Sequence, residues 1–73
     1  MEVIAVITPD DRTFAQLIKF VKDPREFRRI SVIDNVSGYI FKGHFLMWDA
    51  DKIKNLDELL YWIEARTKVN KKL

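Results

Sequence analysis

The chain has 73 residues and a formal net charge of +2, from 13 Lys and Arg against 11 Asp and Glu. This length fits a single domain, and the intermixing of both charge signs does not indicate a nucleic-acid-binding surface. The absence of cysteine excludes disulfides, thiolate zinc sites and cysteine nucleophiles. Small secreted domains are usually rich in disulfides, and neither a signal peptide nor an apolar run of membrane-spanning length is visible. We therefore expect a cytoplasmic protein with no membrane partner.

The first predicted element is a short strand at residues 3–7, which are continuous, apolar and mostly β-branched, as in strands buried on both faces. Thr8 and Pro9 have the residue types of a helix N-cap and of a first helical position. The apolar residues that follow recur at the spacing of one helix face: Phe14, Leu17, Ile18 and Val21. The predicted helix ends at Asp23, because Pro24 disfavours helical geometry in the residue before it.

Two further strands are predicted in the middle of the chain. Residues 30–33 form the second strand, and residues 39–48, which are dense in aromatic side chains, form the third. Residues 35–38, Asn-Val-Ser-Gly, have the composition of a hairpin turn between the two. Gly43 lies in the middle of the third strand and favours a β-bulge or a bend there.

A second helix is predicted in the last third of the chain. Asn55 and Glu58 have the spacing of a capping box, in which the two residues satisfy each other's backbone N–H groups. The apolar side chains of this helix again recur on one face: Leu56, Leu59, Leu60 and Ile63. We expect residues 1–69 to form a single α+β domain and residues 70–73 to be a frayed basic tail.

The predicted element order is therefore β-α-β-β-α. The third strand is the longest and the most apolar, so we place it at the centre of a three-stranded mixed sheet with the order 1-3-2. The second and third strands would be antiparallel, and both helices would cover one face of the sheet. This arrangement resembles a split βαβ fold that lacks its fourth strand.

The aromatic third strand also resembles, in part, a base-stacking strand of RNA-recognition domains. Lys42 and Gly43 match the start of the basic-glycine-aromatic motif of those domains. His44 stands where an aromatic residue belongs, Phe45 stands where a small residue belongs, and the fourth strand is missing. Single-stranded nucleic-acid binding through Lys42, His44 and Trp48 is therefore the alternative function.

Other site chemistries find less support. Oxygen-bearing residues are spaced roughly as in a calcium-binding loop, but without its glycine, and we interpret them as loop and capping residues: Asp49, Asp51, Asn55 and Asp57. His44 is the only histidine, and no nucleophile motif or glycine-rich phosphate loop is present, so we expect no metal, no cofactor and no enzymatic activity. A group of basic residues would either contact phosphates or be solvated, and we favour the second interpretation: Lys19, Lys22, Arg25, Arg28 and Arg29.

The functional prediction depends on an excess of apolar surface. If both helices cover one face of the sheet, the other face exposes a patch of side chains, with one more at the margin of the second helix: Ile40, Lys42, His44, Leu46, Trp48 and Trp62. Such patches usually mark interfaces. We therefore predict a small non-enzymatic binding or regulatory module that acts through protein contacts, as a homodimer or as an inhibitor or adaptor of another protein. The first strand, residues 3–7, would have an unprotected edge through which two copies could pair.

Overall fold

The computed structural model of the chain describes residues 2–67, so the predicted tail at 70–73 lies outside the described residues. The helices and strands follow the predicted order: β1 (Glu2–Ile7), α1 (Asp11–Ile18), β2 (Phe27–Ile30), β3 (Ile40–Leu46) and α2 (Leu56–Ala65). Short 3₁₀ turns lie between them: η1 (Pro24–Glu26), η2 (Ile33–Asn35) and η3 (Ala50–Lys52). The predicted small α+β architecture with two helices and a three-stranded sheet is therefore confirmed. Neither described helix is long and apolar enough to cross a membrane.

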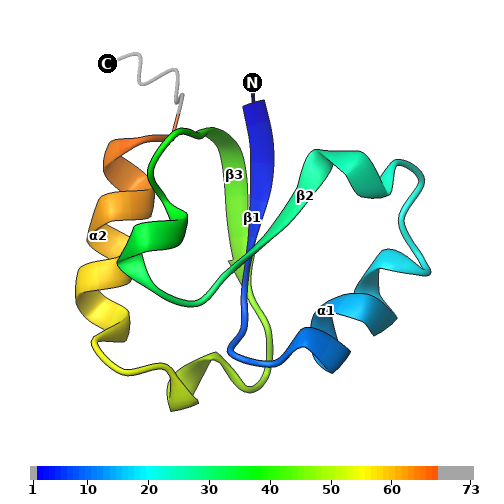
Figure 1. The fold of residues 1–73 in the computed structure, drawn as a ribbon, viewed down its shortest axis with the longest axis horizontal. Helices are drawn as coiled ribbons and strands as arrows, with labels where there is room; N and C mark the ends of the chain where they lie inside the picture. Colours follow the sequence, from blue (N-terminus) through cyan, green and yellow to red (C-terminus); the bar gives the residue numbers. More distant parts are fainter. Residues whose placement is uncertain (1, 68–73) are drawn as a thin grey trace.

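The sheet is parallel throughout, with the strand order β2-β1-β3, so the predicted mixed sheet with the order 1-3-2 is wrong. Residues 35–38 do not close a hairpin, because η2 and the turn after it carry the chain past β1 to the opposite edge of the sheet (Figure 1). β1 takes the centre because most of its side chains are almost completely buried: Val3, Ala5, Val6 and Ile7. β3 is long, but its polar residues Lys42 and His44 suit an edge strand.

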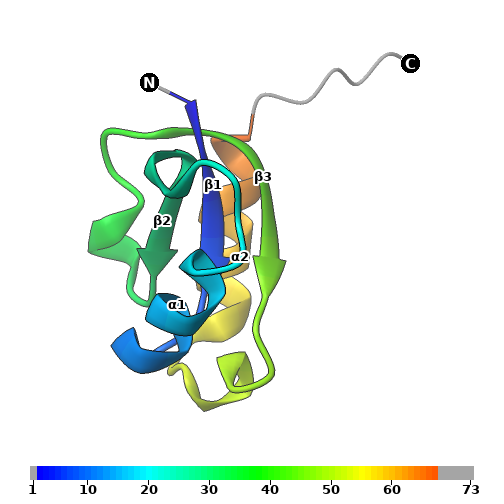
Figure 2. The same cartoon turned by 90° about the vertical axis from the view of Figure 1, so that its right-hand side faces the viewer.

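The two helices lie on opposite faces of the sheet, as Figure 1 and Figure 2 show. Right-handed crossovers explain why α1 and η2 lie on opposite faces, because the chain moves from β1 to one edge and then from β2 across β1 to the other edge. η2 belongs to the second crossover and lies on the α2 side. The prediction that both helices cover one face is therefore wrong, and neither face of the sheet is left wholly bare.

The two faces are packed unequally. The main core lies between the sheet and α2 and consists of buried apolar side chains: Val3, Ala5, Ile7, Ile30, Val36, Phe41, Ala50, Ile53, Leu59 and Ile63. In α1 only Thr13 is buried, while Phe14, Leu17 and Ile18 of the predicted apolar stripe are partly exposed. Helix α1 also ends at Ile18, before the last predicted stripe residue, Val21. The α1 side of the sheet is therefore the more loosely covered side.

The β-bulge that Gly43 favours is confirmed. The register of β3 against β1 changes between Phe41, which lies opposite Val3, and Gly43, which lies opposite Ile4. Lys42 is therefore the extra residue. A bulge shifts the alternation of side chains between the two faces, so the halves of β3 before and after Lys42 follow different patterns.

The helix caps differ from the predicted ones. Asp10, not Thr8, caps α1, since its Oδ1 accepts a hydrogen bond from the backbone N–H of Arg12 at 3.0 Å. Thr8 is buried instead, and its hydroxyl accepts a hydrogen bond from the backbone N–H of Asp10 at 3.1 Å. Asn55 does precede α2, as predicted, with a left-handed φ of 60°, but its side chain makes no capping hydrogen bond within the described structure.

Candidate interaction surface

β3 forms one edge of the sheet (Figure 2). Its C-terminal half exposes large apolar side chains. Phe45 is 37% exposed, Leu46 is 47% exposed, and Trp48, just past the end of the strand, is 72% exposed. We call Phe45, Leu46, Trp48 and the partly buried His44 the β3-edge surface. Apolar side chains gathered along an edge strand are typical of a surface that pairs with another chain.

The backbone of β3 also presents hydrogen-bonding groups along this edge. The backbone N–H of Met47 donates to the carbonyl of Ile7 at 3.1 Å, which fixes the side of the strand that faces β1. Successive residues of a strand direct their N–H and C=O groups to alternate sides, so Phe45 also faces β1. By the same alternation, His44 and Leu46 direct their backbone groups to the outer edge.

The N-terminal half of the same edge is occupied by the chain itself. The backbone N–H of Phe41 donates to the carbonyl of Arg66 at 3.0 Å, and Phe41 forms a parallel β-bridge with Thr67. The Lys42 side chain instead reaches toward the β2 side of the sheet, where its Nζ lies 3.0 Å from Oε1 of Glu26 in η1. Within residues 2–67, the outer edge that remains for another chain is therefore the part occupied by the β3-edge surface.

Side chains of the β3-edge surface project to both faces of the sheet. His44 and Leu46 lie opposite buried residues of β1 on the α2 side. Phe45 lies on the α1 side, where its ring packs edge-to-face on the ring of Phe27 with centroids 6.4 Å apart. Phe45 was not among the residues predicted to be exposed, although the predicted bulge at Gly43 was a signal that its side chain could change face.

The structure does not bring all the predicted interface residues together. His44, Leu46 and Trp48 lie along the β3 edge, and Ile40 is exposed at the opposite end of the strand. Trp62 lies on α2, where it lines a cavity of about 150 Å³ next to η2. The predicted set therefore divides into a group at the β3 edge and a separate residue on the η2 side of α2.

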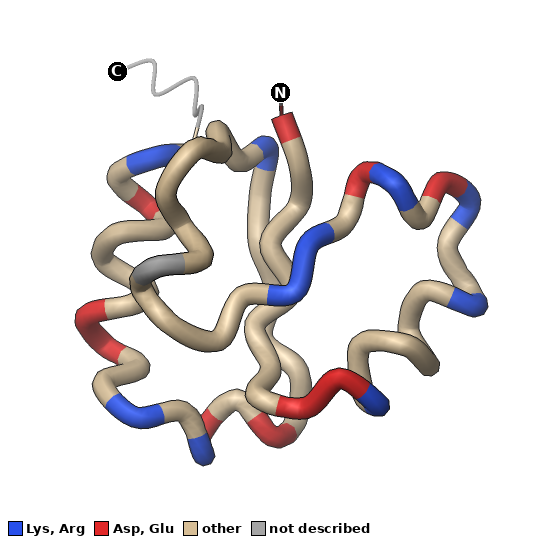
Figure 3. The backbone as a smooth tube through the Cα atoms, viewed as in Figure 1, with Lys and Arg blue, Asp and Glu red and all other residues tan. Residues whose placement is uncertain are grey.

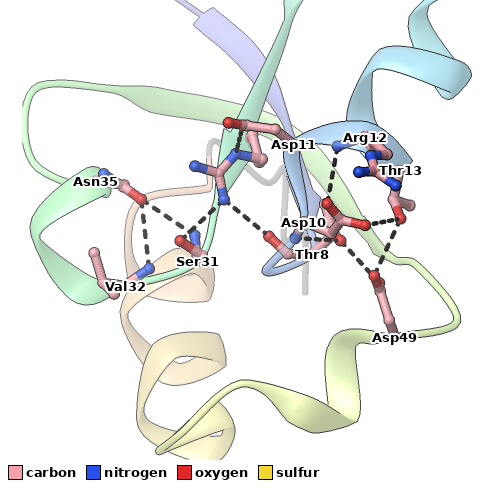
Figure 4. Close-up of polar contacts among 10 residues, drawn as sticks. Thr8, Asp10, Asp11, Arg12, Thr13, Ser31, Val32, Asn35 and Asp49 are labelled. Carbon is pink, nitrogen blue, oxygen red and sulfur yellow. Dashed lines mark hydrogen bonds and ion pairs between the residues drawn. The ribbon is translucent and has the colours of Figure 1, made fainter.

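A buried polar cluster joins the loops at the C-terminal ends of β1 and β3 (Figure 4). The carboxylate of Asp49 accepts hydrogen bonds from the hydroxyl of Thr8 at 2.8 Å and from the hydroxyl of Thr13 at 3.1 Å. All three side chains are buried, so the hydroxyls supply the hydrogen bonds that a buried carboxylate needs. Open parallel sheets often bind ligands at this position, between neighbouring strands whose crossovers leave on opposite faces. Here hydrogen bonds join the two loops, and we interpret the cluster as structural.

An ion pair makes the corresponding link at β2 (Figure 4). Nε of Arg29 lies 2.7 Å from Oδ1 of Asp11, and Nη1 donates to the carbonyl of Thr8 at 3.4 Å and to the hydroxyl of Ser31 at 3.3 Å. The side chain of Asp11 is 86% exposed, so solvent screens the attraction. Arg29, predicted to be a solvated charge, therefore ties the end of β2 to the start of α1.

Among residues 2–67, no three His, Cys, Asp or Glu side chains are grouped as metal ligands. Asp49, the first residue of the spacing that resembled a calcium loop, is bonded to threonine hydroxyls instead. Comparison with protein-family models, with curated proteins and with solved structures finds no match for this chain.

Proposed function

We propose that this chain is a non-enzymatic protein-binding module that forms a homodimer through the outer edge of β3. One observation carries the proposal: outward backbone groups at His44 and Leu46 coincide with the exposed side chains of Phe45, Leu46 and Trp48. In contacts that add a strand to a sheet, backbone hydrogen bonds supply affinity and alternate side chains supply specificity. The pairing predicted for the first strand is wrong, because β1 is the central strand.

A two-fold axis through Phe45 gives a register that fits this edge. Antiparallel pairing would place His44 of each copy opposite Leu46 of the other, so that each pair exchanges two backbone hydrogen bonds. His44 and Leu46 lie on the same face of the sheet, as residues that oppose each other must. Phe45 would face the Phe45 of the second copy at a non-hydrogen-bonded position, where opposing side chains are closest.

Pairing in this register covers side chains that the single chain leaves in water. Fully burying a Leu or Phe side chain contributes about 1.5–3 kcal/mol of stabilisation. Phe45 and Leu46 are partly exposed in the single chain, so their further burial in a dimer would stabilise the contact by part of this amount. A two-fold axis buries the same residues in both copies, so the free energy gained from each residue is gained in each copy. A chain of 73 residues has a small core, so dimer formation would also stabilise its fold.

The alternative of single-stranded nucleic-acid binding has weaker support. It requires a sheet face that is open to bases, whereas helices lie on both faces. Lys42, the basic residue of the RNA-recognition resemblance, is paired with Glu26. Trp48 lies beyond the end of the strand rather than on a face of the sheet.

Sedimentation equilibrium tests the proposal. We expect the wild-type chain to be a dimer at high micromolar concentration and Leu46→Glu to be a monomer, because the substitution places a charge in the buried contact. Phe20→Glu is the matched control, since Phe20 is 85% exposed just after α1 and lies outside β3. A wild-type chain that stays monomeric, or a dimer that Phe20→Glu dissociates as readily as Leu46→Glu does, would contradict the proposal.

A further inference from the structure

A polar cavity lies at the β2 edge of the sheet, opposite to the apolar β3-edge surface. Its volume is about 280 Å³, and its lining combines basic and neutral polar side chains: Arg28, Arg29, Asn35, Ser37 and Tyr39. None of the five is acidic, and each has at least one hydrogen-bond donor. Figure 3 shows the basic stretch of β2 that contributes the two arginines.

The arginines are held in place by the protein. Nη1 of Arg28 donates to the carbonyls of Arg25 and Phe27 at 2.7 and 2.8 Å, and its guanidinium carbon lies 5.8 Å from the centre of the Tyr39 ring. Within the described structure, the contacts of Arg29 engage Nε and Nη1 and leave Nη2 as a donor. A guanidinium group that is already oriented loses less entropy when it binds an anion.

The neutral residues of the cavity add further donors. Oδ1 of Asn35 accepts hydrogen bonds from the backbone N–H groups of Ser31 and Val32 at 3.2 and 3.4 Å. These two bonds fix the orientation of the amide, so its NH₂ group is the end that remains for a ligand. The hydroxyls of Ser37 and Tyr39 can each donate one more hydrogen bond.

We propose that this cavity binds a phosphate monoester. A monoester dianion has three terminal oxygens and accepts several charge-assisted hydrogen bonds at once, which matches a lining rich in donors. The cavity approaches the lower end of the volumes of small-molecule sites, so it also has room for part of the esterified group. Asp11 opposes anion binding through its charge, because its carboxylate lies 2.7 Å from Nε of Arg29.

Titration followed by amide chemical shifts tests this inference at low ionic strength. The two probes are glycerol phosphate, which represents a small metabolite, and a phosphoserine peptide, which represents a phosphorylated protein. The probe that binds more tightly indicates which of the two supplies the phosphate. We expect Arg29→Gln to weaken binding at least about tenfold, and Ser37→Ala and Tyr39→Phe, which keep the fold, to weaken it about two- to tenfold. Asp11→Asn should tighten binding up to about fivefold, a gain that a purely structural Arg29 would not produce.

Arg12→Gln is the matched control, since it removes the same charge from an exposed position on α1 outside the cavity. Its affinity for the probe should equal that of the wild-type chain. No binding at about 10 mM monoester, or equal weakening in Arg12→Gln and Arg29→Gln, would overturn the inference. Tighter binding of a single-stranded oligonucleotide at the same phosphate concentration would also overturn it, in favour of a diester ligand.

Discussion

The two edges of this small sheet differ in how their backbone groups are covered. At β2, a strand of four residues, the guanidinium of Arg28 lies against the carbonyls of Arg25 and Phe27. Just beyond the strand, the side chain of Asn35 accepts the backbone N–H of Ser31. Short strands and charged side chains are the usual means by which a protein prevents an edge from pairing. β2 is therefore protected by its own side chains.

At β3, a strand of seven residues, the protection covers only half of the edge. The chain itself pairs with the N-terminal half at Phe41, and Lys42 adds a charge at the bulge. Within residues 2–67, no segment pairs with the outer side of the C-terminal half and no Lys or Arg lies on it, and it exposes Leu46 and Trp48. The unprotected edge of β3 is the basis for the proposed strand pairing, and the arginine-lined edge of β2 is the basis for the proposed anion site.

The largest expected change in stability comes from the hydrogen bonds of Asp49, which join the loop after β3 to the loop after β1. Asp49→Ala should lower the free energy of unfolding by about 2–4 kcal/mol, because the buried hydroxyl of Thr8 loses its acceptor and that of Thr13 loses the nearer of its two acceptors. Urea denaturation measures the change, with the exposed Asp51→Ala as control. A loss below 1 kcal/mol would show that this cluster does not hold the loops together.

A substitution at β2 should make the two edges alike. Arg28→Leu removes the donors that cover the carbonyls of Arg25 and Phe27, at a cost of about 1–2 kcal/mol in stability. With both edges unprotected, we expect assemblies larger than the dimer in light scattering at high micromolar concentration. Arg25→Leu, at an exposed position, should leave the mass unchanged. If Arg28→Leu also leaves it unchanged, the protective role of Arg28 is wrong.

A smaller effect is expected at the start of α1. Asp10→Ala should cost about 0.5–2 kcal/mol, because the side chain of Asp10 caps the helix through the backbone N–H of Arg12. Thermal unfolding measures the loss. Asp57→Ala, in the first turn of α2 but without a capping role there, should cost less than Asp10→Ala.

The smallest expected effect concerns the ion pair at β2. A double-mutant cycle with Asp11→Ala and Arg29→Ala should give a coupling energy below about 1 kcal/mol, because Asp11 is exposed and solvent screens the pair. A coupling energy well above this value would show that the Arg29–Asp11 ion pair stabilises the fold as strongly as the hydrogen bonds of Asp49 do.

Local patterns in the sequence predict much of this fold. The continuous apolar run of β1, the bulge at Gly43 and the apolar stripe of α2, of which Leu59 and Ile63 are buried, are all confirmed. Each of these features depends on residues that are neighbours along the chain. The strand order was predicted from the length and apolar content of the third strand, although the uninterrupted apolar run of β1 was the better guide to the central strand.

The remaining features depend on contacts between distant residues. The hydrogen bond between Thr8 and Asp49 joins residues 41 positions apart, and no pattern of neighbouring residues predicts it. The turn composition of residues 35–38 fits a crossover as well as a hairpin, so it does not decide whether β3 is parallel. The candidate surface was predicted only in part, because Phe45 changes face at the bulge and Trp62 lies elsewhere.

The central claim is that the outer edge of β3 is a dimer contact, and amide hydrogen exchange tests it residue by residue. We predict that the N–H groups of His44 and Leu46 are protected at high micromolar concentration and exchange freely on dilution, while those of Phe45 and Met47, which face β1, stay protected at both concentrations. If His44 and Leu46 exchange freely at a concentration where the chain is dimeric, the contact lies elsewhere and the account is contradicted.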